Sequence, residues 1–521
     1  MTNPSTLYRG GVLHCPADPS ATALLVSGGR IAWLGTDGDA PPADRVVDLG
    51  GALVTPAFVD AHVHATDTGL ALSGLELSGV RSAGQLLDAV ARFAAGLPAD
   101  AVVLGHGWDE SGWSDPTLPD AAALDRAAGG RRVYLSQASI HSALVSSALL
   151  VACPQVVDSA GYDASGWLRR DAHHVVRAAA QGSVSRAQRV AAQRVALSHA
   201  ASLGIAAVHE CGGPEISDEE DFTGLLGISG AGLPEVYGYW GELGGAARAR
   251  ELGAVGAGGD LFADGALGSR TAHVSQAYGD GDGCGHGYLT VEQVRDHLLD
   301  CAAHGMQGGF HAIGDAAIGT VLEGFAGAAR TLGVEKLRAA RHRIEHAEIM
   351  NKRMIAGFVE YGVVASMQPA FDRLWGGAGR MYESRLGLDR SLESNPMGAM
   401  HGVGVALAFG SDSPVTPLDP WGSVRAAAAH HNPAQRMSVR AAFAAHTRGG
   451  WRAVHLDVEG VLALGAPATF AVWSTPAGVE RGLPVLLAED PEVRGPDDPT
   501  PLPVCRSLVL RGEVIYEEGA S

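Results

Sequence analysis

Two histidines, His62 and His64, close an apolar run over residues 52–58 and stand a single residue apart. On a β-strand such residues point to the same face, whereas on a helix they would lie roughly 200° apart. Two imidazoles side by side at the end of a strand can chelate one divalent cation. The pair alone carries little information, because isolated histidines also occur on surfaces and in satisfied cores.

Three later apolar runs end in residues of the same kind, namely His311, His346 and Asp412. Each of them alone could be a cap, a turn residue or a satisfied polar group. Together with the first pair they form a nitrogen and oxygen donor set of the type that binds Zn²⁺. The sequence therefore predicts a divalent-metal site, with Zn²⁺ as the favoured ion.

Apolar, strand-like runs alternate with alanine-rich helical stretches through the middle of the chain, which is typical of a parallel α/β fold. We expect eight strands, at residues 55–64, 132–137, 204–210, 259–264, 308–311, 342–346, 363–368 and 405–410. Eight such units predict a (β/α)8 TIM-type barrel over residues 55–452, with an insertion at about 65–130. Barrel enzymes carry their active site where the strands end, which is where the ligand-type residues fall.

Both ends of the chain read as short strands separated by glycine-containing turns, such as Gly28–Gly29 and Gly512. Glycine pairs between alternating apolar runs indicate hairpins. We predict one small β-sandwich domain composed of residues 1–54 and 453–521.

The composition bounds the class of protein and its partners. The 521 residues are 46% hydrophobic and 18% charged, which describes an ordered globular protein. A net charge of −19 argues against nucleic acid or an anionic membrane as a partner. No apolar run approaches ~20 residues, no secretory leader is recognisable, and the six cysteines are scattered, so we expect a cytoplasmic protein. The expected partner is a small-molecule substrate, and a homodimer is left open.

The chain resembles the amidohydrolase superfamily and, within it, the amidohydrolase-3 (YtcJ-like) family. The motifs are FVDAHVH at 58–64, GWD at 107–109, LFADGALGSRT at 261–271, HAIGD at 311–315, RIEHA at 343–347 and GSD at 410–412. The resemblance implies a hydrolase that cleaves an amide-type C–N bond of a small, partly apolar substrate with metal-activated water. It implies His62, His64 and His311 as ligands, His346 as a ligand or oxyanion group, and Asp412 as proton acceptor and ligand.

One departure from the family concerns the number of metals. Many relatives carry a carbamylated lysine that bridges two metals, and this chain has Asp260 at that position. The only lysines, Lys336 and Lys352, lie in helical segments that cannot reach the site. Asp260 is expected early in its strand with a short reach, so Glu210 is the better bridging candidate. We expect one metal per chain and leave a carboxylate-bridged pair open.

Three further residues are candidates for substrate binding: His141, Trp108 and Asp109. For His141 a role in the loop is an equal alternative, and for Trp108 so is packing of the insertion. Two other functions stay open: a metal-assisted isomerase or lyase on the same scaffold, and a non-catalytic binding relative.

Overall fold

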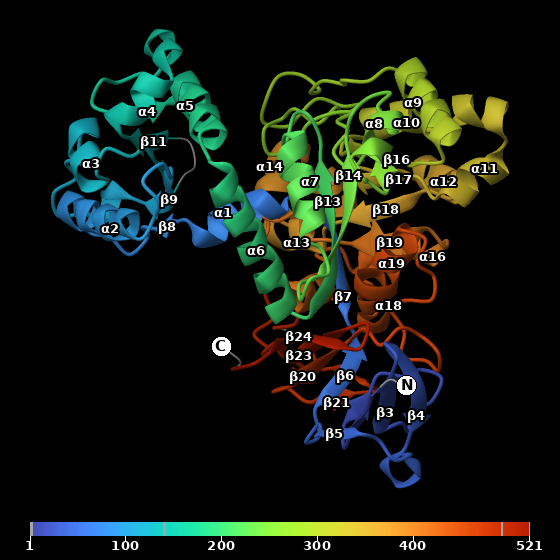
Figure 1. Ribbon diagram of the computed structural model, residues 1–521. Helices are drawn as coiled ribbons and strands as arrows, with labels where there is room; N and C mark the ends of the chain where they lie inside the picture. The colour runs from blue at the N-terminus through green and yellow to red at the C-terminus, as the bar shows by residue number, and fades with distance from the viewer. Residues whose placement is uncertain (1–3, 139–141, 491–492, 520–521) are drawn as a thin grey trace. The chain divides into compact units, whose positions relative to one another are not determined.

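The computed structural model describes residues 4–138, 142–490 and 493–519. The chain forms two compact units, one of Met1–Ala65 with Leu197–Ser521 and one of Thr66–Ala196. Helix α1 (Ala65–Ser73) begins at the first boundary and helix α6 (Arg186–Ser202) runs through the second. Each unit is described by itself, with the elements labelled in Figure 1.

The larger unit is organised around a sheet of eight parallel strands in the order β19-β18-β17-β16-β15-β14-β13-β7. Their bounds are β7 Phe58–Val63, β13 Ile205–Gly212, β14 Glu235–Trp240, β15 Gly256–Ala257, β16 Gln307–Ala312, β17 Arg343–His346, β18 Val364–Met367 and β19 Ala406–Phe409. A parallel bridge between Val63 and Ser413 brings the first strand to the segment that follows the last. The predicted (β/α)8 barrel is confirmed.

Helices accompany these strands along the chain, and their ends follow local sequence signals. Thr290 and Gln293 form a capping box at the start of α9 (Val291–His304), and Gly305 ends that helix in the left-handed conformation. Asn351 caps α12 (Lys352–Tyr361), since its side chain accepts from the N–H groups of Arg353 and Met354. The other helices of the unit are α7 Glu219–Gly227, α8 Ala246–Glu251, α10 Asp315–Leu332, α11 Val334–Ala340, α13 Pro369–Trp375, α14 Met381–Leu386, α15 Leu388–Glu393, α16 Met397–Gly402, α17 Pro420–Ala428, α18 Val439–Ala444 and α19 Gly450–Ala453.

Two of the eight predicted strands were placed wrongly. The run at residues 132–137 forms β10 (Val133–Gln137), which belongs to the sheet of the other unit, and the barrel uses β14 instead. Strand β14 escaped notice because Glu235 and Gly238 interrupt its apolar pattern. The fourth strand begins at Gly256, three residues before the predicted start.

The unit of residues 66–196 has its own five-stranded sheet, in the order β12-β11-β10-β9-β8. Its other strands are β8 Leu75–Glu76, β9 Val103–Trp108, β11 Ser142–Val145 and β12 Trp167–Arg169, and its helices are α2 Ala83–Ala95, α3 Ala121–Ala127, α4 Ser147–Ala152 and α5 Arg170–Gly182. Leu86 and Val90 of α2 pack against Val103 and Leu135 in a buried core. The predicted insertion at about 65–130 falls within this unit.

Strands from both termini form two further sheets, which lie side by side in Figure 1. One has the order β4-β3-β1-β5 and the other β2-β6-β20-β23-β24. The bounds are β1 Ser5–Arg9, β2 Val12–Leu13, β3 Ala23–Ser27, β4 Arg30–Gly35, β5 Arg45–Asp48, β6 Leu53–Pro56, β20 Phe470–Ser474, β23 Val504–Leu510 and β24 Glu513–Glu517. Tyr8 and Phe470 meet edge to face in their shared core, with ring centroids 5.1 Å apart. This pair of sheets is the predicted β-sandwich.

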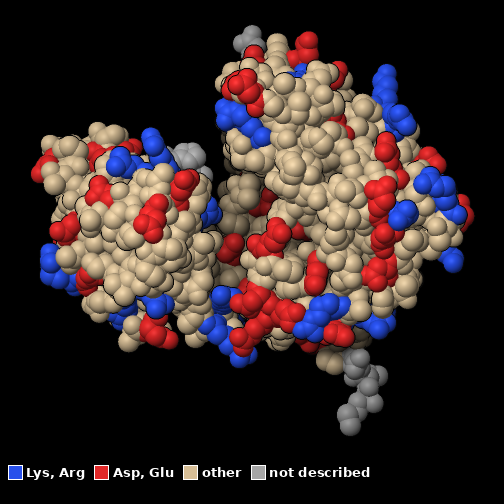
Figure 2. All heavy atoms as spheres, turned by 90° about the horizontal axis from the view of Figure 1, so that it is seen from above, with Lys and Arg blue, Asp and Glu red and all other residues tan. Residues whose placement is uncertain are grey.

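The surface drawn in Figure 2 mixes acidic and basic side chains among uncharged ones. No extended basic patch covers that face of the described residues, in keeping with the net charge of −19. Within the same described ranges, no helix is long and apolar enough to cross a membrane.

Candidate metal centre

The strand ends of the barrel bring the five predicted ligands together with Asp260. His62 lies on β7 and His64 just beyond it, His311 on β16, His346 at the end of β17, and Asp412 after β19. Parallel strands of a barrel all end at the same rim, so residues far apart in sequence converge there. Five of the six residues are buried, and His64 is partly exposed.

Asp260 occupies the middle of this group. Its Oδ2 atom lies 3.4 Å from His62 Nε2 and 3.3 Å from His64 Nε2. Its Oδ1 atom lies 3.3 Å from His311 Nδ1 and 3.7 Å from His346 Nε2. The carboxylate therefore faces one pair of histidines with each oxygen.

Asp412 lies beside the first pair of histidines, His62 and His64. Its Oδ1 atom lies 3.5 Å from His62 Nε2 and 3.3 Å from His64 Nε2. The Asp412 backbone adopts a left-handed conformation with φ 58°, and its N–H donates to the His62 carbonyl oxygen at 2.8 Å. A non-glycine residue rarely adopts this conformation, and such residues gather at functional sites.

The expectation that Asp260 would fall short of the site is wrong, and the start of β15 explains why. Because β15 (Gly256–Ala257) begins and ends before the predicted start at residue 259, Asp260 lies beyond the end of the strand and not near its beginning. The segment that follows β15 runs very close to β16, since a Cβ on Gly258 would lie 2.2 Å from Gly309 N. Pairing resumes between Phe262 and His311, which holds Asp260 level with the histidine.

Glu210, the predicted bridging residue, lies near the end of β13 and is buried. Its Oε2 atom accepts a hydrogen bond of 2.8 Å from the Ala65 backbone N–H. Within the described part of the chain, the groups of potential ligand atoms that lie within 4.8 Å of one another include Asp260 and exclude Glu210. The structure thus favours Asp260 as the carboxylate shared between the histidine pairs.

The donor atoms have the properties that a cation requires. His62 Nε2 is buried without a hydrogen-bond partner, whereas His62 Nδ1 contacts Glu345 Oε2 at 2.9 Å. His346 Nδ1 contacts Gln368 Oε1 at 2.8 Å, and His311 Nε2 contacts the Gly265 carbonyl oxygen at 3.3 Å. Each ring is thereby oriented through one nitrogen and turns the other toward Asp260, as metal-binding histidines do. The six residues fit a divalent-metal site.

The pKa shifts of these residues also fit a site for a cation. Burial opposes charge on His62 and His64, yet the pKa of both rings lies well above the ordinary value: Cys211, Asp260 and Asp412 raise that of His62, and Asp260 and Asp412 raise that of His64. Burial likewise opposes charge on Asp260, and the surrounding histidines hold its pKa well below the ordinary range. The carboxylates therefore favour positive charge in this space, which protons or metal ions can supply in competition.

Three acidic residues that the sequence analysis did not single out support the site from behind. Asp60 Oδ1 accepts hydrogen bonds from the N–H groups of His62 and Ser411, which ties the ends of β7 and β19 together. Asp264 accepts from the backbone N–H of Ile313 and Gly314. Both sit inside motifs already quoted, so their position in otherwise apolar buried strands was the available signal.

Glu345, the third of these residues, is fully buried below His62. The neighbouring Arg343 donates hydrogen bonds to both Glu345 oxygens and reaches the Ala61 carbonyl oxygen. Burial raises the pKa of Glu345, but Arg343 and His62 outweigh it and lower that pKa to about 2. Glu345 is thus held as a carboxylate that fixes the His62 ring.

A cavity of about 300 Å³ opens beside the ligands and is lined mainly by apolar side chains. Its walls include Phe262, Leu267, Ile313, Phe371, Trp375 and Met381. Glu348 also lines it. Burial raises the pKa of this carboxyl group to about 7, although the hydrogen bond from the Tyr382 hydroxyl lowers it. Such a cavity suits a small, partly apolar molecule.

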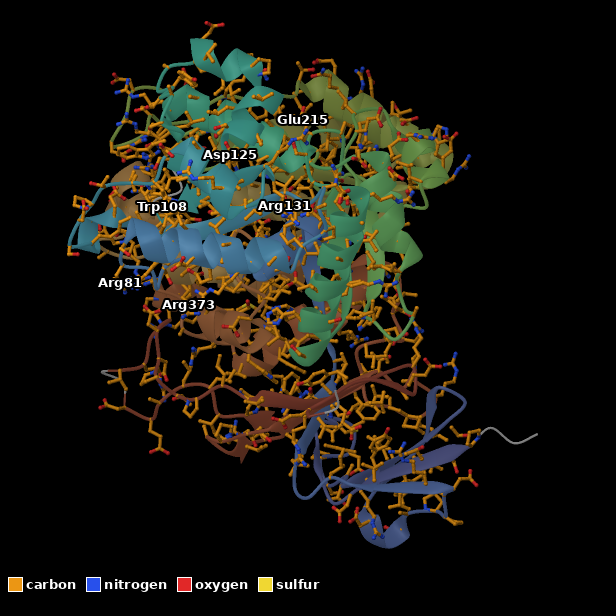
Figure 3. The ribbon with its side chains drawn as sticks, turned by 60° about the vertical axis from the view of Figure 1, so that its left-hand side comes forward. Arg81, Trp108, Asp125, Arg131, Glu215 and Arg373 are labelled. Atoms are coloured by element: carbon orange, nitrogen blue, oxygen red, sulfur yellow. The ribbon has the colours of Figure 1, made fainter. Side chains whose placement is uncertain are left out.

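The three predicted substrate-binding residues belong to the unit of residues 66–196 or lie outside the described residues. Trp108, labelled in Figure 3, is buried in the core of that unit, and its Nε1 donates to the Leu135 carbonyl oxygen at 2.8 Å. Asp109 Oδ1 accepts from Ser111 N at 2.9 Å within a local turn. His141 falls outside the described residues. A substrate role for these three stays a prediction.

Comparisons with known proteins give similarities over the whole chain. A model described as "Amidohydrolase family" matches residues 45–516. The chain is 25% identical to "Putative amidohydrolase YtcJ" of Bacillus subtilis, over 98% of this chain and 99% of that protein. It is 32% identical to the "N-substituted formamide deformylase" of Arthrobacter pascens, over 25% of each chain.

Among solved structures, an uncharacterised metal-dependent hydrolase from Pyrococcus furiosus superposes with a TM-score of 0.74. The match covers 90% of this chain and 98% of that one, at 23% sequence identity. At this identity the likeness concerns the fold alone.

Proposed function

We propose that this chain, which belongs to the amidohydrolase family, is a metal-dependent hydrolase that cleaves an amide-type C–N bond of a small molecule. Family membership supports a hydrolase in general, and the His/Asp cluster supports a divalent metal. The observation that carries the proposal is the convergence of four imidazoles and two carboxylates beside an apolar cavity. The partial similarity to a formamide deformylase supports the choice of a C–N bond.

The donors divide into two sets that share Asp260. His62, His64 and Asp412 would hold one cation through Nε2 and Oδ1 atoms, and His311 and His346 would hold a second. Asp260 would serve both, since each of its oxygens faces one set. We therefore propose two ions in place of the single ion expected from the sequence, with Zn²⁺ as the ion that this nitrogen and oxygen set favours. Bound divalent ions would polarise the substrate carbonyl and acidify water.

The protein groups have separate tasks in this proposal. Asp412 is placed to accept a proton from the attacking water and pass it to the leaving nitrogen, because its carboxylate borders the cavity. His346 acts as a ligand, since Gln368 engages its Nδ1 atom and the Nε2 atom faces Asp260. The apolar walls hold the substrate body and keep bulk water from the reacting bond.

A substrate screen with metal-loaded protein tests the proposal. N-acyl amines, N-formyl amines, cyclic imides and ureides would be offered in water enriched in ¹⁸O, and products would be identified by mass spectrometry. We expect an acid product that contains ¹⁸O, since hydrolysis consumes water. A product isomeric with its substrate would instead establish the isomerase alternative.

The variant Asp412→Asn isolates the proton transfer. We expect it to lose at least ~10²-fold in turnover, the usual scale for a general base. The exposed Asp282→Asn removes the same charge away from the site and should keep wild-type turnover. Unchanged turnover in Asp412→Asn at full metal content would refute its role.

A further inference from the structure

One acidic side chain of the cavity, Glu348, has no task in the proposed hydrolysis. It follows His346 by two residues and is 2% exposed, and it lines the same cavity as the metal centre. Apart from the metal-centre residues, the cavity wall is apolar except for Glu348 and Tyr382. A carboxyl group is costly to bury in such surroundings without hydrogen-bond donors.

The protein supplies Glu348 with few donors. The Tyr382 hydroxyl donates to its Oε2 atom, and the buried Asn395 side chain is a second polar neighbour that lowers the pKa of the carboxyl group. A carboxylate can accept about four hydrogen bonds, so this cavity-lining group keeps acceptor capacity. A ligand in the cavity that carries a donor would satisfy it.

The backbone holds Glu348 in place. The Asn395 N–H donates to the Glu348 carbonyl oxygen at 2.8 Å. The preceding residue, Ala347, adopts a left-handed conformation with φ 47° and donates its N–H to the Ala312 carbonyl oxygen at 3.1 Å. Fixed positioning of this kind is typical of residues that select a ligand.

Three aromatic rings line the cavity together with the Glu348 carboxyl group. Trp375 lies between Phe371 and Tyr382, with ring centroids 4.7 and 6.2 Å away, and all three line the cavity. Ring faces attract ammonium groups as well as apolar bodies. The surroundings of Glu348 thus favour a nitrogen-bound donor attached to an apolar framework.

We propose that Glu348 selects substrates that carry an N–H donor, either a protonated amine or an amide, on an apolar body. The donor contacts the Glu348 carboxyl group while the scissile bond lies at the metal centre. This inference rests on the proposed function, because it assumes that the reacting end of the substrate occupies the metal centre.

Three para-substituted benzohydroxamates provide the test, since a hydroxamate anchors on metal and the distal group can be varied. The distal groups are aminomethyl, carboxamide and methyl, and binding to metal-loaded protein would be measured by calorimetry. We expect at least one of the two N–H probes to bind about tenfold or more tightly than the methyl probe, the scale of a hydrogen bond to a charged group. Comparing the affinities of the two N–H probes shows whether the site prefers an ammonium donor or an amide donor.

Substitution of Glu348 links the preference to this residue. In Glu348→Met, which keeps the length of the side chain and removes the carboxylate acceptor, the preference for the tighter-binding N–H probe over the methyl probe should fall about tenfold, while methyl-probe affinity changes less than about twofold. The exposed Glu335→Gln removes the same charge from α11 and should keep the wild-type pattern. The wild-type protein alone already tests the inference, because equal binding of all three probes would overturn it.

The outcomes separate this inference from the proposed function. Binding of all three probes without an N–H preference, or a preference that survives in Glu348→Met, would overturn the role of Glu348 and leave the metal centre standing. Failure of every probe to bind metal-loaded protein would contradict the metal centre and, with it, the inference.

Discussion

Replacing Asp260 by alanine should reduce the metal content from near two ions per chain to near one. His62, His64 and Asp412 would still offer three donors to one ion, whereas His311 and His346 would keep only two neutral ones. Two unit charges ~4 Å apart attract by about 4 kcal/mol at an effective dielectric constant of about 20. At about 1.4 kcal/mol per factor of ten, loss of the carboxylate should weaken the second ion by ~10³-fold or more.

Elemental analysis after dialysis against metal-free buffer measures this directly, with Zn²⁺ reloaded at a controlled free concentration. Glu210→Gln is the matched control and should keep two ions, because Glu210 bonds the Ala65 N–H instead of facing the histidines. Two tightly bound ions in Asp260→Ala would refute the shared carboxylate. One ion in the wild-type protein would refute the two-ion centre itself.

Two further predictions concern lysine chemistry and pH. Activity should not respond to added bicarbonate, because the only lysines, Lys336 and Lys352, are exposed on α11 and α12; turnover with and without bicarbonate checks this. Burial lowers the pKa of His342 from 6.5 to about 4, so its contribution to stability is complete above pH 6.5 and is lost as the pH falls toward 4. The stability lost over this window is roughly 3 kcal/mol. Melting temperatures at pH 7 and pH 5 should therefore show a smaller acid-induced drop in His342→Asn than in wild type.

The parts of the site that could be predicted from sequence depend on local pattern and on one global rule. The spacing of His62 and His64 fixes their common face, and the convergence of parallel strand ends then brings in His311, His346 and Asp412. Neither step requires knowledge of side-chain packing. The same holds for α9 and α12, whose caps at Thr290 and Asn351 are written in the sequence.

The insertion was harder to predict, because β10 has a more regular apolar pattern than β14, the strand that takes the place in the barrel. Strand β10 is apolar and short, as a barrel strand should be, and periodicity cannot tell which sheet an apolar run joins. Strand β14 contains Glu235, whose carboxylate pairs with Arg511, a residue 276 positions away. A contact of that separation leaves no local signal.

Asp260 shows how a small error in a strand boundary changes the chemistry inferred. The segment around Gly256, Gly258 and Gly259 has almost no side chains, so it offers no alternation from which to find the start of β15. These glycines are nevertheless what lets β15 approach β16 closely enough to bring the Asp260 carboxylate between two histidine pairs. In the proposed two-ion centre, a short acid that follows a closely packed strand takes the place of a long carbamylated lysine, because the backbone itself lies close to the histidines. The absence of lysine from the site and the glycine-rich strand are, on this argument, two aspects of one structural solution.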